Sequence, residues 1–261
     1  MSIEIALSGA LGRMGRRIAS LAADAGHRVT VPIDRHEAGS TLGDIIGDKR
    51  QLASIATAYG GGADVMIDFS LPAAFSTRLA ECVKHKTAFV SGTTGLGEAQ
   101  FSELQAAGKS IPVLWAANMS LGVNLLLGLV RQAAAALPES YDIEITEMHH
   151  RRKVDAPSGT ALALLNAVCA GNGREAAEVI RNGRSGHTGE RTSREIGMHA
   201  LRGGDVVGDH TVMFATDGER IELTHKASSR DTFAQGAIRA AEWLKGKAPG
   251  VYQMAQVLGL K

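Results

Sequence analysis

The sequence predicts an α/β protein in two parts, an N-terminal open parallel sheet and a C-terminal α+β part with a mixed or antiparallel sheet. Three observations predict this division. Short apolar runs alternate with helical patterns through the first half of the chain. A long helical pattern over residues 121–137 ends that alternation. Beyond it, strand patterns follow one another with only short turns between them, as is typical of an antiparallel or mixed sheet.

The first strand is predicted over residues 3–7, and Gly9, Gly12 and Gly15 follow it. Apolar residues then recur at helical spacing, and a second strand pattern covers residues 29–33. Strand, glycine-rich turn, helix and strand is the context of a dinucleotide-binding turn, where backbone N–H groups and the helix dipole hold a pyrophosphate. The spacing is G-x-x-G-x-x-G rather than G-x-G-x-x-G, so a turn chosen only for packing is the alternative.

Two charged residues stand at the end of the second strand. Asp34 lies 19 positions after Gly15, where a carboxylate can bind the ribose hydroxyls of NADH. Arg35 follows directly and can meet the 2′-phosphate of NADPH. A solvated strand end is the alternative for both residues. Their adjacency favours a chain that accepts both NADH and NADPH.

Three further strands are predicted over residues 64–69, 87–91 and 111–115, and each ends in small polar residues. Ligands of an open parallel sheet lie at the carboxyl ends of its strands. We therefore expect the loops after these strands to line the cofactor site. The second loop, residues 92–95, has a plain turn before a helix as its alternative.

The second half has a different organisation. A polar, glycine-rich segment over residues 181–194 lacks periodicity, and we expect an exposed, mobile loop there. A helical pattern returns over residues 232–244. The strands predicted in this half cover residues 142–148, 196–201, 211–215 and 221–224.

A basic segment follows the first of these strands. All five residues from His149 to Lys153 are basic. Ser158 is placed to cap a helix that begins near Gly159, with Leu162, Leu164 and Leu165 expected on its buried side. The N–H groups at such a helix start bind carboxylate or phosphate, and histidine or lysine beside them can donate a proton.

Two other interpretations of this segment are possible from its residues. A solvated basic turn is the simpler alternative, although the coincidence of cations and a helix start argues against it. A metal site is excluded, because adjacent histidines on a strand point to opposite faces and no Asp, Glu or Cys cluster completes a ligand shell. We therefore expect no metal.

Composition narrows the class of protein further. The 28 basic and 27 acidic residues nearly balance and only 4% of residues are aromatic, which argues against a nucleic-acid binder. No apolar run reaches the length of a membrane span, and the N-terminus leads into a strand pattern rather than a signal peptide. Cys82 and Cys169 are too few for a disulfide framework. We expect a cytoplasmic protein whose ligands are small molecules, with no nucleic acid or membrane partner.

The segment over residues 149–160, His-His-Arg-Arg-Lys-Val-Asp-Ala-Pro-Ser-Gly-Thr, closely resembles the signature of the 4-hydroxy-tetrahydrodipicolinate reductase (dihydrodipicolinate reductase) family. The resemblance runs the full length of the chain. Met119 stands where the family commonly has Phe, and Asp34 where Glu also occurs; both departures bear on cofactor preference. Further matching segments are residues 9–15, 92–95, 116–120, 201–214 and 225–233.

The resemblance implies a Rossmann-type dinucleotide-binding domain over residues 1–119, a substrate-binding and oligomerisation domain over 120–229, and C-terminal helices over 230–261 that return to the first domain. It implies hydride transfer from NADH or NADPH to a small cyclic dicarboxylate, in diaminopimelate and lysine biosynthesis, by a homotetramer. The cofactor-binding residues expected are Gly9, Ala10, Leu11, Gly12, Arg13, Met14, Asp34, Arg35, Gly92, Thr93, Thr94, Ala116, Ala117, Asn118 and Met119.

The resemblance also assigns roles within the basic segment. His149 is the general acid/base and Lys153 the assisting proton donor. The residues that bind the substrate's carboxylates are His150, Ser158, Gly159 and Thr160. This agrees with the interpretation from the residues alone, because a dicarboxylate needs cationic groups and a helix start.

Two alternatives belong to other functional classes. A different two-domain dehydrogenase is one, although a semialdehyde dehydrogenase would need a reactive cysteine at the nicotinamide, and neither Cys82 nor Cys169 lies in a suitable loop motif. A non-enzymatic NADPH-binding redox sensor is the other. It would account for the glycine turn but leave the proton donors and the anion site without a role.

Overall fold

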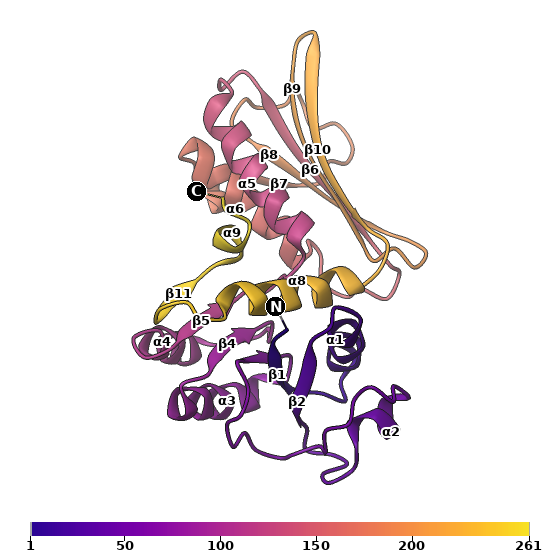
Figure 1. Cartoon of the computed structure of the whole chain (residues 1–261). Coiled ribbons are helices and arrows are strands. Elements are labelled where there is room, and N and C mark those ends of the chain that lie inside the picture. The colour runs from indigo at the N-terminus through magenta and orange to yellow at the C-terminus, as the bar shows by residue number, and fades with distance from the viewer. Residues whose placement is uncertain (1, 261) are drawn as a thin grey trace. The chain divides into compact units, whose positions relative to one another are not determined.

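The computed structural model describes residues 2–260, which form two compact units (Figure 1). One contains the residues up to Leu121 and those from Asp231 onward. The other is Gly122–Arg230. The chain therefore leaves the first unit once and returns to it.

The first unit contains an open six-stranded sheet in which every pair of neighbouring strands is parallel. The spatial order is β11-β5-β4-β3-β1-β2, so the strand order reverses between β1 and β3 as in doubly wound, Rossmann-like sheets. The edge strand β11 was not predicted from the sequence. The strands are β1 (Glu4–Ser8), β2 (Arg28–Ile33), β3 (Val65–Asp68), β4 (Ala88–Ser91), β5 (Pro112–Trp115) and β11 (Gly250–Tyr252).

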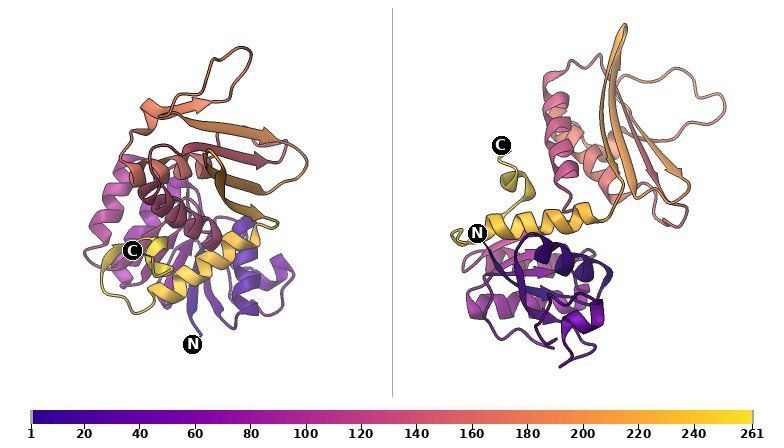
Figure 2. Two further views of the ribbon diagram at one scale, coloured as in Figure 1. Left: turned by 90° about the horizontal axis from the view of Figure 1, so that it is seen from above. Right: turned by 45° about the vertical axis from the view of Figure 1, so that its right-hand side comes forward.

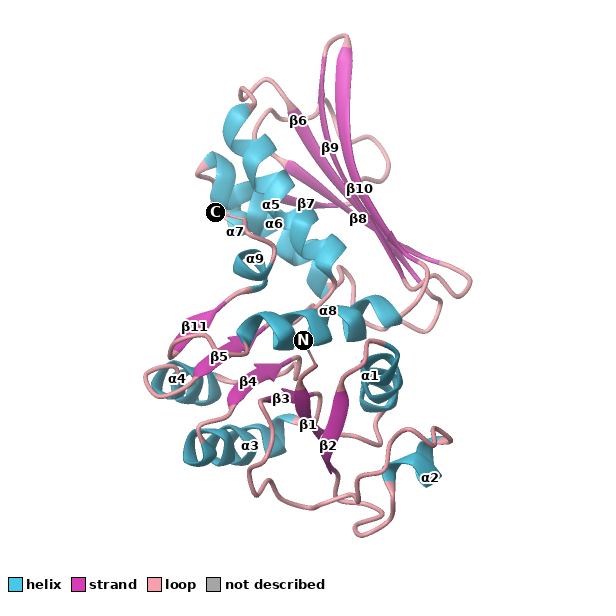
Figure 3. Ribbon diagram, in the orientation of Figure 1, coloured by secondary structure: helices cyan, strands magenta, loops and turns pink. Residues whose placement is uncertain are grey.

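Helices cover both faces of this sheet, which explains why its central strands β3 and β4 are buried along their whole length. On β1, Ile5 and Leu7 pack in one hydrophobic cluster with residues of α1 and α8, whereas Ala6 packs in another with α3 and α4. Figure 3 shows these two helix pairs on opposite sides of the strands. The helices are α1 (Arg13–Asp24), α2 (Leu42–Ile46), α3 (Pro72–His85), α4 (Glu98–Ala107), α8 (Asp231–Leu244) and α9 (Met254–Val257).

The second unit contains a mixed five-stranded sheet in the order β10-β9-β6-β8-β7. The pairs β10–β9 and β9–β6 are antiparallel, and β6–β8 and β8–β7 are parallel. The predicted mixed sheet is therefore confirmed. The elements are α5 (Leu121–Ala136), β6 (Asp142–His149), α6 (Gly159–Asn172), α7 (Ala176–Val179), β7 (Ile180–Asn182), β8 (Ile196–Arg202), β9 (Gly208–Thr216) and β10 (Glu219–Ala227).

Only one face of this sheet is covered by helices within the unit, as Figures 1 and 2 show. Ile143 and Ile145 of β6 pack with Phe214 of β9 and with apolar residues of α5 and α6. The intervening side chains of β6 are only partly buried, so the strand alternates. That alternation places Glu147 and His149 on the buried side and Glu144 on the other.

Two predictions about this unit were wrong in part. Residues 181 and 182 belong to β7, and Arg184 and Arg191 tie the segment after them to Glu144 through ion pairs. Ion pairs made by arginine side chains do not produce a hydrophobic periodicity. The sequence pattern of this segment therefore predicted only an exposed loop. Leu162, expected on the buried side of α6, is 40% exposed.

Candidate functional site

The glycine turn after β1 is built so tightly that side chains are excluded from it. Gly9 has φ of +75°, and a Cβ there would lie 2.7 Å from the carbonyl oxygen of Phe69. A Cβ on Gly15 would lie 2.1 Å from the carbonyl oxygen of Gly9. Gly12 precedes α1 without a capping side chain. The first-turn N–H groups of α1, which have no partners within the helix, therefore face the turn.

The carboxylate of Asp34 is fixed beside this turn. Its Oδ2 accepts a hydrogen bond from the Leu11 backbone N–H (3.1 Å), and its Oδ1 accepts from that of His36 (3.2 Å). Arg35 is exposed next to it. Gly9, Leu11, Gly12, Asp34 and Arg35 line one pocket of about 610 Å³. A pocket of this size, with a glycine cradle at one end and an acidic strand end beside it, fits the pyrophosphate and ribose of a dinucleotide.

A buried carboxylate that the sequence analysis missed connects two of the expected cofactor loops. Asp68, at the end of β3, is fully buried. It accepts hydrogen bonds from the hydroxyls of Ser70 (2.6 Å), Ser91 (3.0 Å) and Thr93 (2.7 Å). The Trp115 indole N–H donates to the carbonyl oxygen of Thr93 (2.8 Å). The only feature of the sequence that could have indicated this network was an acidic residue at the end of an apolar strand.

The remaining expected cofactor residues divide by burial. Ala10, Thr93 and Met119 are buried, so their side chains face the protein interior rather than a ligand. Met119 packs in the core between the sheet and α8, where a Cβ on Gly236 would meet its carbonyl oxygen. A cofactor contact by these three residues would go through the backbone. Those at least partly exposed are Arg13, Met14, Gly92, Thr94, Ala116, Ala117 and Asn118.

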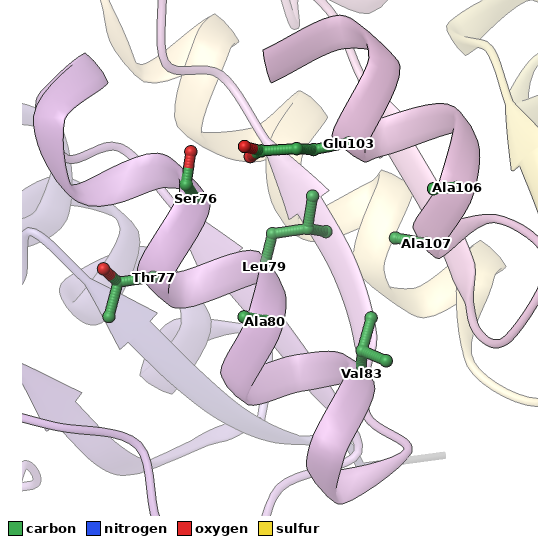
Figure 4. Close-up of a pocket in the computed structure, with 8 residues that line it drawn as sticks. All are labelled: Ser76, Thr77, Leu79, Ala80, Val83, Glu103, Ala106 and Ala107. Atoms are coloured by element: carbon green, nitrogen blue, oxygen red, sulfur yellow. The ribbon is translucent and has the colours of Figure 1, made fainter. Parts of the chain in front are cut away.

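A separate pocket of about 660 Å³ lies between α3 and α4, and none of the predicted site residues lines it (Figure 4). Its walls are mostly aliphatic, and Glu103 is its one charged side chain among those described. It lacks the converging polar groups of a substrate site.

In the second unit, the end of β6 carries the candidate proton donor. His149 is the last residue of the strand, and its Nδ1 lies 2.6 Å from Oε2 of Glu147. Arg202, at the end of neighbouring β8, donates two hydrogen bonds to the same carboxylate (2.8 and 2.9 Å). The ring of His210 on β9 packs edge to face on that of His149, with 5.1 Å between the centroids.

The predicted helix start lies at the same place. Ser158 caps α6, and its hydroxyl accepts a hydrogen bond from the Ala161 N–H (3.2 Å). The Ser158 N–H donates to Oε1 of Glu147 (3.0 Å). The Ser158 hydroxyl also lies 3.3 Å from Nε2 of His210. One buried carboxylate therefore contacts both the histidine and the residue that caps the helix.

Burial and neighbouring charges set the protonation states in this cluster. Burial raises the pKa of Glu147, but hydrogen bonds from Arg202 and His149 outweigh it and hold the pKa below its usual value. Burial, reinforced by the charge of His149, lowers the pKa of His210 to about 4. At neutral pH Glu147 is therefore ionised and His210 uncharged.

The other residues of the basic segment lie around this cluster without joining it directly. The Lys153 ammonium pairs with Asp155 at 3.0 Å. The His150 backbone N–H donates to the carbonyl oxygen of Val206 (2.8 Å). Among the described residues, no hydrogen-bond partner lies near the buried Nδ1 of His150. Gly159 and Thr160 form the first turn of α6, as expected.

Sequence reasoning assigned no role to Glu147, Arg202 or His210. Glu147 stands two positions before His149, so the two side chains lie on the same face of the strand. This spacing could have predicted that the carboxylate contacts the histidine. Arg202 and His210 reach the cluster only through strand pairing with β6, which sequence spacing does not reveal.

A dinucleotide cradle on one unit and a carboxylate-held histidine beside a capped helix start on the other define a two-domain, pyridine-nucleotide-dependent oxidoreductase. Comparison with known proteins then gives the particular family. The family profile for the N-terminus of dihydrodipicolinate reductase matches residues 3–119, and that for its C-terminus matches residues 122–258. The chain belongs to the dihydrodipicolinate reductase family.

Full-length relatives agree with this assignment. The chain is 49% identical over 269 residues to a 4-hydroxy-tetrahydrodipicolinate reductase from Thiobacillus denitrificans, with 100% of both chains covered. It is 48% identical over 265 residues to one from Pseudomonas fluorescens, covering 98% of this chain and 99% of the relative.

Solved structures share the fold. A dipicolinate-bound dihydrodipicolinate reductase from Paenisporosarcina sp. TG-14 has a TM-score of 0.74 at 20% identity, covering 98% of this chain and 99% of that one. An amine dehydrogenase from Mycobacterium smegmatis has a TM-score of 0.60 at 12% identity, covering 97% and 95%. The two-unit architecture is thus shared among dehydrogenases, and the family assignment rests on the sequence relatives.

Proposed function

We propose that the chain reduces 4-hydroxy-tetrahydrodipicolinate to tetrahydrodipicolinate with a hydride from NADH or NADPH, in the diaminopimelate route to lysine. One proton is consumed and one water is released for each hydride transferred. The coincidence of a held histidine with a capped helix start, in a chain closely related to such reductases, carries the proposal.

The first unit supports binding of the nucleotide. The turn formed by Gly9, Gly12 and Gly15 admits a pyrophosphate against backbone N–H groups and the start of α1. The Asp34 carboxylate is placed to accept hydrogen bonds from ribose hydroxyls, and the exposed Arg35 to meet a 2′-phosphate. We propose that both cofactors are used. When bound, the pyridine nucleotide supplies the hydride.

The second unit supports binding of a small dicarboxylate. The first turn of α6, at Gly159 and Thr160, favours an anion through its N–H groups and the helix dipole. Lys153 and His150 add cationic or hydrogen-bonding groups from the adjacent turn. The fixed cap at Ser158 holds the helix start still, so that the carboxylate sites keep their spacing.

His149 is the proposed proton donor. The substrate has a carbon–carbon double bond conjugated to an imine once its water is lost, so hydride addition at one end requires a proton at the other. An imidazole can both donate and accept a proton, so the side chain of His149 is suited to that transfer. Lys153 is the proposed assisting proton donor.

The proposal is tested by oxidation of NADH and NADPH in the presence of freshly generated dihydrodipicolinate synthase product. We expect oxidation with both cofactors that depends on that product. Binding of NADPH with no product-dependent oxidation would support the redox-sensor alternative. Turnover of a semialdehyde instead would support another dehydrogenase, although Cys82 and Cys169 are buried and burial raises the pKa of both thiols.

We also propose a cytoplasmic homotetramer. The helix-free face of the second sheet supports self-association, because it presents the exposed side chain of Leu201. Sedimentation of the purified chain tests the tetramer. None of the described helices is long and apolar enough to cross a bilayer.

A further inference from the structure

Glu147 is the most heavily hydrogen-bonded carboxylate at the proposed site. Its side chain is completely buried. Oε2 receives His149 Nδ1 at 2.6 Å and Arg202 at 2.8 Å, and Oε1 receives Arg202 at 2.9 Å and the Ser158 N–H at 3.0 Å. Each oxygen therefore accepts two hydrogen bonds, which leaves the carboxylate little freedom to rotate.

We propose that Glu147 is a positioning residue that holds His149 in a single tautomer, with the hydrogen on Nδ1 and with Nε2 as the atom that exchanges the proton. A carboxylate paired with Arg202 is ionised and can only accept hydrogen bonds. Nδ1 of His149 must then be the donor. This inference rests on the proposed function, because it concerns how His149 performs its proposed role.

The surroundings of Nε2 agree with this assignment. A Cβ on Gly208 would lie 3.0 Å from His149 Nε2, so the absence of a side chain at Gly208 leaves space beside that atom. The ring of His210 packs against that of His149 in a T-shaped arrangement and restricts its rotation. The ring of His149 is thus held at Nδ1 by Glu147 and by its packing with His210, while Nε2 lies on the side of Gly208.

The same carboxylate couples the two halves of the site. Through Ser158 it fixes the beginning of α6, and through His149 it fixes the proton donor. Arg202 extends the connection, because it also donates to the carbonyl oxygen of Asp155 (2.7 Å) in the turn between them. The buried carboxylate of Glu147 therefore fixes the position of the proposed proton donor, His149, relative to the proposed anion site at the start of α6.

The chain provides a matched control on the same strand. Glu144 is also a carboxylate held by a histidine and arginines: His199 Nε2 lies at 2.6 Å, and Arg184 and Arg191 pair with it. It lies on the opposite face of β6 and has no contact with His149 among the described residues. The Glu144→Gln variant therefore removes the carboxylate charge from a similar cluster on β6. It changes no residue of the proposed site.

The test compares Glu147→Gln, Glu147→Asp, Arg202→Lys and Glu144→Gln. We expect Glu147→Gln to lower kcat by about 100-fold, as loss of the group that orients a catalytic histidine does, while the substrate KM stays within about fivefold. Glu147→Asp retains the charge and recovers about tenfold of that loss. Glu144→Gln keeps kcat within about twofold. NADH affinity, measured on every variant, reports folding of the first unit.

Nitrogen NMR of histidine-labelled protein gives a readout that a merely structural role would not change. The His149 signals are assigned by their loss in His149→Gln. At alkaline pH, where imidazoles are neutral, we expect hydrogen on Nδ1 only in the wild type and a mixture of tautomers in Glu147→Gln. An unchanged tautomer in Glu147→Gln, or a kcat no lower than that of Glu144→Gln, would overturn the inference.

Failure of the inference is distinguishable from failure of the proposed function. If His149→Gln itself keeps wild-type turnover, the proposed acid is wrong, whatever the tautomer. If His149→Gln loses turnover and Glu147→Gln does not, only the positioning role is wrong. Should Glu147→Gln not fold, Arg202→Lys carries the test, with an expected loss in kcat of about tenfold; an unchanged kcat in that variant would contradict the inference.

Discussion

The glycine turn of the first unit and the β6–α6 region of the second perform different tasks by different means. We propose that the glycine turn recognises its ligand with backbone, and its defining feature is the exclusion of side chains at Gly9 and Gly15. The β6–α6 region depends on side chains that converge from three strands and a helix start. A backbone site is general for dinucleotides, whereas the proposed side-chain site would select the reaction.

A substitution at Gly15 tests the proposed role of the glycine turn, and we expect the largest effect on cofactor binding there. The Gly15→Val side chain would enter the space of the Gly9 carbonyl oxygen and displace α1, so the Kd for NADH should rise by more than about 100-fold. Calorimetric titration with NADH measures it. Gly60→Ala, at an open position, is the control. Tight binding by the valine variant would show that the turn does not hold the pyrophosphate.

Arg35→Ala should sharpen the account of cofactor choice. Loss of the guanidinium should raise the KM for NADPH by about tenfold and leave that for NADH nearly unchanged, because only NADPH carries the 2′-phosphate. Steady-state kinetics with both cofactors measure the difference. Lys84→Ala, an exposed cation on α3, controls for general loss of charge. Equal changes for the two cofactors would contradict this role of Arg35.

Ser158→Ala should weaken the second region at the helix start. Loss of the cap should destabilise the unit by about 1 kcal/mol and raise the substrate KM several-fold, since the Ala161 N–H loses its partner. Thermal unfolding and steady-state kinetics measure the two effects. A lower melting temperature with an unchanged KM would separate the cap from the anion site.

The smallest effect concerns pH and the control cluster at Glu144. Burial raises the pKa of this carboxyl, but hydrogen bonds from Arg184, His199 and Arg191 outweigh it and lower the pKa to about 2. A carboxyl group whose pKa is lowered by folding stabilises the folded state at pH values above its ordinary pKa. This stabilisation is lost as the pH falls toward 2. Between about pH 6 and about pH 3, unfolding midpoints should fall less in Glu144→Gln than in the wild type. Equal falls would show that the cluster does not contribute.

Much of this comparison could be predicted from the sequence, because local patterns determine local structure. The glycine spacing after an apolar run predicted β1, the turn and α1, and Ser158 predicted the cap of α6. Hydrophobic periodicity could not reveal that β11 completes the parallel sheet, since a three-residue edge strand is too short to show a period. The partners of His149 were also hidden. Arg202 and His210 reach it only after strands distant in sequence have paired.

The division of tasks between the two regions is tested most directly by measuring kcat and the Kd for NADH on His149→Gln. We expect kcat to fall by about 1000-fold, within the range for loss of a general acid, while the Kd stays within about twofold of the wild type. A kcat close to that of the wild type, or a Kd that weakens in parallel with kcat, would contradict the account.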